Sequence, residues 1–136
     1  MRAKEFMQKV YDAGAELQLL ENKKASYLEL ATGTGSGLSS VPTTRTKEGS
    51  RVENAAVRIA DLTTSLDEQA GVYIELIKQA EALINKIPQI KYREVLSYRY
   101  LCRYNWKTVQ EKMGYTDSSS VYHAHGFALS ALQRIM

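Results

Sequence analysis

The sequence predicts an all-α protein in which a long N-terminal helical hairpin or coiled coil precedes a C-terminal helix-turn-helix domain. Two long segments repeat apolar residues at alternating steps of three and four, which is the spacing of a heptad repeat. Shorter helical segments follow Pro88, with Gly114 at the position of a sharp turn between two of them. We therefore predict two parts, residues 1–87 and residues 88–136.

Apolar stripes define the two long helices. Neither stripe is stable in water, so each must pack against the other, against a second copy of the chain, or both. The second helix would span about 35 residues, or roughly 50 Å. The first stripe comprises Ala3, Phe6, Val10, Ala13, Leu17, Leu20, Lys24, Tyr27 and Ala31. The second comprises Val52, Ala56, Ile59, Thr63, Leu66, Ala70, Tyr73, Ile77, Ala80, Ile84 and Ile87. The side chains expected to mediate oligomerisation are Phe6, Val10, Leu17, Leu20, Ile59, Leu66, Tyr73 and Ile77.

Residues 32–50 are predicted to form a flexible linker between the long helices. The segment contains four glycines, Pro42 and many hydroxyl side chains, which do not sustain a regular element. Its 19 residues allow the first helix to fold back on the second or to pass to a neighbouring protomer. A phosphate-binding loop is not predicted, because the TGTGSG run lacks a preceding strand and a following Gly-Lys-Ser/Thr.

Three helices are predicted after Pro88, which disfavours helical geometry in the residue before it. They span residues 92–101, 106–113 and 118–135. Gly114 lies where the turn between the last two requires a positive φ, and Asp117 is placed to cap the last helix. An apolar stripe on this last helix is expected to pack on the two preceding helices. It consists of Val121, Ala124, Ala128, Leu132 and Ile135.

Charge and composition limit the classes of function. Residues 88–136 carry seven Lys and Arg against three Asp and Glu, whereas residues 1–87 carry 11 against 12, so the positive charge accompanies the helix-turn-helix. The composition is ordinary for a soluble protein, and no apolar stretch approaches the ~20 residues that a membrane span needs. Because the first residues lack the apolar core of a signal peptide, a cytoplasmic location without membrane contact is expected.

Enzyme activity, metal binding and cofactor binding are not predicted. The single cysteine, Cys102, excludes an intrachain disulfide. His123 and His125 are two residues apart on a predicted helix, so they point about 200° apart and cannot bind one metal ion together. No nucleophile, base and orienting acid occur together in the sequence.

The candidate DNA-binding residues lie in and beside the predicted helix-turn-helix. Hydroxyl, tyrosine and histidine side chains near the start of its last helix suit phosphate and base-edge contacts. This helix has no Lys or Arg before Arg134, so sequence-specific binding would either be weak or depend on Tyr122, His123 and DNA shape. The candidates are Arg99, Arg103, Lys107, Thr108, Ser118, Ser119, Tyr122 and His123.

Several short motifs in the last third of the chain form a recognisable pattern. They are Leu83 to Pro88, the run Arg93-x-Val95-Leu96-x-x-Arg99-Tyr100, Trp106 and Val109, the turn Met113-Gly114-Tyr115, and Ala128-Leu129. Over about 50 residues this pattern resembles region 4 of bacterial sigma factors. It is more closely similar to the sigma-like C-terminal domains of phage and integrative-element regulators, including late-transcription activators of the ArpU, RinA and LtrC type. The resemblance implies promoter or operator binding with residues 118–126 in the major groove, and contact with RNA polymerase.

The favoured function is therefore a phage or mobile-element transcriptional regulator that binds double-stranded DNA as a homodimer or a higher homo-oligomer. The alternative is a helical interaction protein that uses a repurposed helix-turn-helix to bind and inhibit another protein, such as RNA polymerase or a host defence effector. The salt dependence of DNA binding discriminates between the two, because phosphate contacts release counterions.

Overall fold

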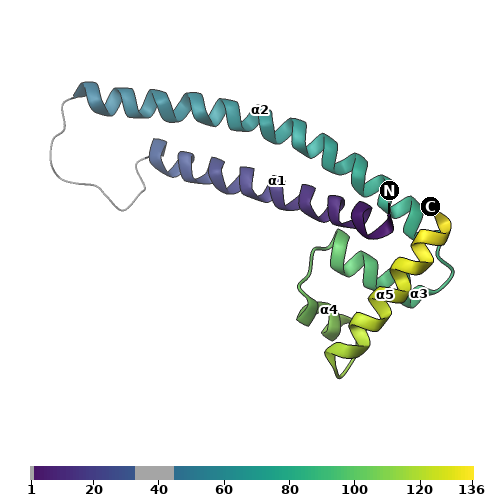
Figure 1. Cartoon of the computed structure of the whole chain (residues 1–136). Helices are drawn as coiled ribbons and strands as arrows, with labels where there is room; N and C mark the ends of the chain where they lie inside the picture. Colours follow the sequence, from purple (N-terminus) through teal and green to yellow (C-terminus); the bar gives the residue numbers. More distant parts are fainter. Residues whose placement is uncertain (1, 33–44) are drawn as a thin grey trace. The chain divides into compact units, whose positions relative to one another are not determined.

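The described part of the chain is built from helices (Figure 1). The computed structural model describes residues 2–32 and 45–136, and within these ranges it contains no strand, which confirms the all-α prediction. The elements in chain order are α1 (Ala3–Thr32), α2 (Arg45–Ile84), α3 (Ile90–Leu96), η1 (Ser97–Leu101), α4 (Trp106–Met113) and α5 (Ser118–Ile135). None of the described helices combines the length and apolarity required to cross a lipid bilayer.

Element boundaries match the prediction best near the C-terminus. The predicted helices 106–113 and 118–135 are confirmed as α4 and α5. The linker prediction is wrong at both ends, because Thr32 is the last residue of α1 and the backbone of residues 45–50 already belongs to α2. Arg45, Lys47 and Glu48 are good helix formers, and the helix continues through Gly49 and Ser50 despite their lower helix propensity. The rest of the predicted linker, residues 33–44, lies outside the described residues.

The chain divides into two compact units. The first unit comprises residues 1–14 and 72–136, and the second comprises residues 15–71, so α1 and α2 each contribute to both. The division differs from the predicted boundary between residues 87 and 88. The physical reason is that the first turns of α1 and the last turns of α2 share one core with the C-terminal helices.

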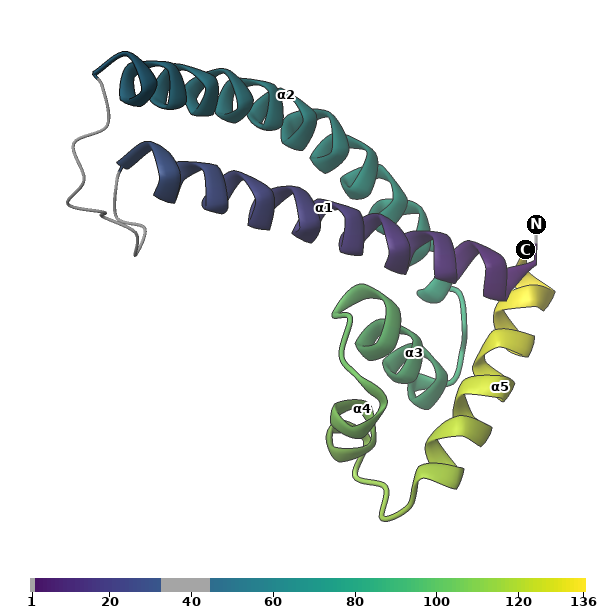
Figure 2. The same cartoon turned by 60° about the vertical axis from the view of Figure 1, so that its left-hand side comes forward.

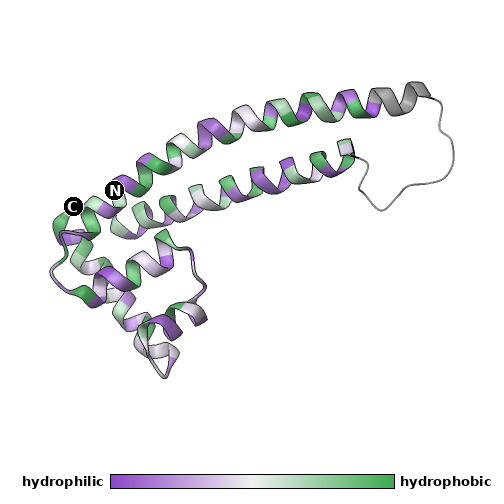
Figure 3. Ribbon diagram, turned by 180° about the vertical axis from the view of Figure 1, so that it is seen from behind, coloured by the Kyte–Doolittle hydropathy of each residue, from purple (hydrophilic) through white to green (hydrophobic). Residues whose placement is uncertain are grey.

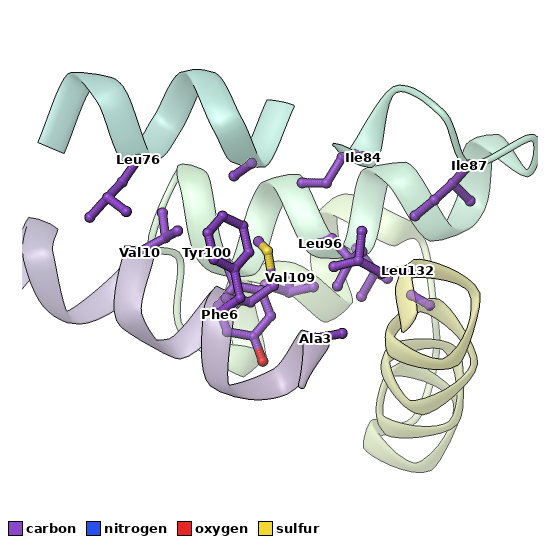
Figure 4. Packing of buried hydrophobic residues seen from close by; sticks show 14 of the residues in the cluster. Ala3, Phe6, Val10, Leu76, Ile84, Ile87, Leu96, Tyr100, Val109 and Leu132 are labelled. Atoms are coloured by element: carbon purple, nitrogen blue, oxygen red, sulfur yellow. The ribbon is translucent and has the colours of Figure 1, made fainter. Parts of the chain in front are cut away.

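The core of the first unit joins segments that are far apart in the sequence (Figure 4). Met7 and Val10 of α1 are fully buried together with Val109 of α4 and Leu132 of α5. The backbone N–H of Ala3 donates to Oε1 of Gln133 at 2.7 Å, which ties the start of α1 to the end of α5. Within this unit α5 runs from its turn with α4 toward the first turn of α1 (Figure 2).

Two residues predicted to mediate oligomerisation belong instead to this core. Phe6 and Val10 are 8% and 0% exposed and pack inside the first unit, so the prediction is wrong for both. A helical period shows that a face is buried but does not identify the element that covers it, and here the chain's own C-terminal helices do so. Tyr73 and Ile77 are also in the first unit and are half-buried.

The second unit has a sparse core. Among residues 15–32 and 51–71, the buried side chains are Ala55 and Leu62. The other predicted oligomerisation residues of this unit are half-buried: Leu17, Leu20, Ile59 and Leu66. Hydrophobic and hydrophilic residues alternate along both of its helices (Figure 3). Large apolar side chains consequently remain exposed, with Leu30 at 58% and Val57 at 60%.

Candidate functional site

The α4–α5 connection is fixed by local hydrogen bonds and one glycine. Asn105 caps α4 by accepting from the backbone N–H of Thr108 at 2.8 Å. Gly114 ends α4 with φ +74°, the left-handed region that favours glycine, as predicted. Asp117 caps α5, also as predicted, by accepting from the backbone N–H of Ser120 at 2.9 Å. Hydrogen bonds from the hydroxyl and the backbone N–H of Ser120 hold the pKa of Asp117 below its ordinary value.

The predicted outward face of α5 is exposed in the structure. Val121, Ala124 and Ala128 turn into the core, and this fixes the rotation of the helix. The ring of Tyr122 is 49% exposed and meets Trp106 edge-on, with 5.2 Å between ring centroids. The remaining predicted residues of α5 are all exposed: Ser118, Ser119 and His123. Four predicted side chains therefore share the solvent side of one capped helix.

Lys107 and Thr108, the predicted DNA-binding residues of α4, differ in their exposure to solvent. Lys107 is exposed at the start of α4 and is available to a phosphate group. Thr108 is half-buried, and its backbone N–H is already used by the Asn105 cap. Lys112 is a further exposed cation on this helix, although its ammonium group lies 5.9 Å from the ring centroid of Tyr104.

Arg99 and Arg103 are engaged within the chain. The guanidinium of Arg99 lies 4.8 Å from the ring centroid of Tyr11 and 4.6 Å from that of Trp106. Its Nη1 donates to the carbonyl oxygen of Tyr104 at 3.0 Å. The guanidinium of Arg103 lies 4.7 Å from the same Tyr11 ring. Both half-buried arginines thus connect α1 with the segment before α4, a structural role that the sequence did not predict.

Gly14 makes the close approach of Arg103 possible. A Cβ atom at Gly14 would lie 2.6 Å from Cδ of Arg103 and 3.0 Å from the hydroxyl oxygen of Tyr73, so a side chain there would displace one of them. Arg103 itself has φ +58°, a conformation that is unfavourable for a residue with a Cβ atom. Packing Arg103 against Gly14 of α1 therefore costs backbone conformational energy at Arg103.

A partly buried polar pair connects η1 with α5. The hydroxyl of Tyr100 lies 2.6 Å from Nε2 of His125, and the His125 ring packs edge-on against Trp106 at 4.7 Å between centroids. Burial lowers the pKa of His125 to about 4, with further lowering by the charges of Lys4 and Arg99. Burial also raises the pKa of Tyr100. The neutral imidazole is therefore the form that the fold favours.

The role of His125 was missed at the level of sequence, although a signal was present. His125 lies four residues after Val121, on the buried side of the α5 stripe, whereas His123 lies on the solvent side. No comparable signal exists for Tyr100, because the direction of its side chain depends on η1. There the backbone N–H of Cys102 donates to the carbonyl of Ser97, an i to i+5 bond that rotates the side chains out of α-helical register.

Comparison with known proteins gives no relative: no family model, no curated protein and no solved structure matches this chain. Among the described residues, no group of three or more His, Cys, Asp or Glu side chains is placed to hold a metal ion. The geometry and charge of the first unit are the remaining basis for a proposal.

Proposed function

We propose that this chain binds double-stranded DNA through α4 and α5, as a transcriptional regulator of the phage or mobile-element kind. The observation that carries the proposal is the solvent face of α5. It presents hydroxyls, a tyrosine and an imidazole from a capped helix that packs on α4. From Ser118 to Ile135 the sequence contains no Asp or Glu, so a polyanion meets no like charge on α5 itself.

The charge of the first unit supports the same partner. Residues 1–14 and 72–136 contain 12 Lys and Arg against seven Asp and Glu, a net charge of +5. Residues 15–71 contain six against eight, a net charge of −2. The unit that contains α4 and α5 is therefore the basic part of the chain, and phosphate neutralisation supplies most of the affinity of non-specific DNA binding.

The salt dependence of DNA binding tests this proposal. Neutralising Lys107 with glutamine is expected to weaken binding to all duplexes by a similar factor and to lower the salt slope by roughly one unit. A matched control is Lys78→Gln on α2, an exposed lysine 3.6 Å from Glu75, which is expected to leave the slope unchanged. Fluorescence anisotropy on random duplexes over a salt series gives both slopes.

Two outcomes would contradict the proposal. Wild-type protein that binds no duplex even at low salt would exclude DNA as the partner and favour a protein-binding role for the solvent face of α5. An equal salt slope for wild type and Lys107→Gln would place the phosphate contacts elsewhere.

We further propose that the second unit self-associates into a homodimer or a higher homo-oligomer. The side chains that are buried among its described residues, Ala55 and Leu62, are a small core for two paired helices, because a hydrophobic stripe is normally covered along its length. Leu19, Leu30 and Val57 are each more than half exposed. A second copy of the same hairpin offers a surface of the same apolar character.

Charged substitutions of these exposed residues test the self-association. Glutamate at Leu19, Leu30 and Val57 together is expected to convert an oligomer into a monomer, because unpaired carboxylates would enter the interface. The control places glutamate at Val72 and Ile74, which are similarly exposed on α2 but belong to the first unit. Light scattering at micromolar concentration gives the mass of each. A monomeric wild type, or a triple variant that keeps its oligomer mass, would refute this proposal.

A further inference from the structure

A large aromatic side chain is exposed on α5. Phe127 is 62% exposed, and the ring contact that the structure provides is a tilted one with Tyr92, at 6.5 Å between centroids. One exposed apolar residue is ordinary on a protein surface. Phe127 is of interest because it lies next to Gly126, a helix glycine that no contact within the described residues explains.

Gly126 has no structural purpose within the described residues. Glycine in a helix interior is less favourable than alanine, so it is expected where a side chain would clash or where φ is positive. A Cβ atom at Gly126 would meet no atom within 4 Å, and its φ lies outside the positive range. Gly14 and Gly114 both have such reasons inside the chain, whereas Gly71 of α2 is as open as Gly126. What distinguishes Gly126 from Gly71 is its place on the solvent face of α5, beside His123 and Phe127, where a partner that approaches the helix backbone would use the missing side chain.

Gly126 and Phe127 continue the solvent face of α5 that contains the candidate base-reading residues. Steps of four and three residues lead from Ser119 to His123 and on to Gly126, so these positions lie on one side of the helix. Phe127 follows His123 by four residues and is exposed on the same side. This extended face, Ser119, His123, Gly126 and Phe127, contains no Asp, Glu, Lys or Arg.

We infer that Gly126 and Phe127 form an apolar reading contact in the major groove, in which duplex DNA comes closest to α5 at Gly126 and the Phe127 ring covers the 5-methyl group of a thymine. This inference rests on the proposed function. The thymine methyl is the one apolar group that the base pairs present in the major groove, and an aromatic ring is a suitable partner for it. The absence of acidic residues from α5 and the net charge of +5 of the first unit select a polyanion as the occupant.

Two glycine-to-alanine variants distinguish an effect on the close approach of DNA to α5 from an effect on helix stability. Gly126 and Gly71 both lie inside helices with no atom within 4 Å of an added Cβ, so alanine at either is expected to keep or raise the melting temperature. Gly126→Ala is expected to weaken binding to an A·T-rich duplex by about fivefold or more, because the methyl group holds the duplex away from the helix. Gly71→Ala on α2 is expected to bind as wild type. Equal affinity of the two variants would overturn the close approach at Gly126.

A change in the DNA tests the role of Phe127. Wild type is compared on an A·T-rich duplex and on the same duplex in which deoxyuridine replaces every thymine, which removes only the 5-methyl groups. We expect about fivefold weaker binding without the methyl groups, and we expect Phe127→Ala to abolish this difference. Tyr122→Ala is the control, since it is expected to weaken binding while keeping the preference for thymine. The exposure of Phe127 predicts that its alanine variant folds, and its melting curve verifies this.

The possible results distinguish this inference from the function on which it rests. Binding of both duplexes with equal affinity by wild type, or a thymine preference that survives in Phe127→Ala, would overturn the reading contact and leave DNA binding intact. Failure of wild type to bind either duplex at low salt would overturn the inference and the proposed function together.

Discussion

Replacing Met7 with alanine is expected to destabilise the whole first unit by about 2–5 kcal/mol, the usual cost of removing a large buried side chain. Met7 is 0% exposed and lies in α1, yet its core includes Val109 of α4 and Leu132 of α5. Urea unfolding monitored by the fluorescence of Trp106, the single tryptophan, reports the loss directly from α4. A substitution in the first turns of α1 is therefore expected to lower the stability of the helices in the last third of the chain.

The control for this prediction is Lys9→Ala on the same helix. Lys9 is exposed and belongs to the first unit, so its truncation is expected to change the free energy of unfolding by no more than about 0.5 kcal/mol. If residues 88–136 folded without α1, as the predicted domain boundary implies, Met7→Ala would leave the Trp106 transition at the wild-type urea concentration. That result would contradict the shared core.

The sequence was sufficient where the structural cause is local. Gly114 and Asp117 fix the ends of α4 and α5 through a positive φ and a side-chain cap, and both depend on neighbouring residues alone. The apolar stripe of α5 in turn fixes which side of that helix faces solvent. As a result the exposed positions of Tyr122 and His123 follow from the spacing of the apolar residues on their own helix.

Long-range pairing could not be predicted in the same way. The heptad spacing of α1 correctly indicated that Phe6 and Val10 are buried, but the same spacing fits a partner helix, a second copy or the C-terminal helices. From the sequence alone, Gly14 is simply a residue of low helix propensity inside a predicted helix. The side chain that requires a glycine there belongs to Arg103, which is 89 residues away in the sequence. Contacts of this kind depend on the arrangement of whole helices rather than on local spacing.

Acidification is expected to destabilise the protein through His125. Burial lowers the pKa of His125 to about 4 in the folded state, whereas its ordinary value of 6.5 applies to the unfolded chain. Between these values the unfolded state binds more protons than the folded state, so the free energy of unfolding falls as the pH decreases. The stabilisation is fully present above pH 6.5 and is lost as the pH falls toward 4. The full shift corresponds to about 3 kcal/mol, and because the ring is only partly buried we expect about 1–2 kcal/mol.

The two histidines of α5 provide a matched pair for this measurement. His125→Gln removes the partly buried titrating group, so the free energy of unfolding of this variant is expected to vary less between about pH 6.5 and 4.5 than that of wild type. His123→Gln, which removes an exposed histidine two residues away on the same helix, is the matched control for the loss of an imidazole from α5. Because each variant is compared with itself across pH, the loss of the hydrogen bond to Tyr100 does not enter the comparison. Parallel pH profiles for wild type and His125→Gln would show that the Tyr100–His125 pair does not control the acid sensitivity of the fold.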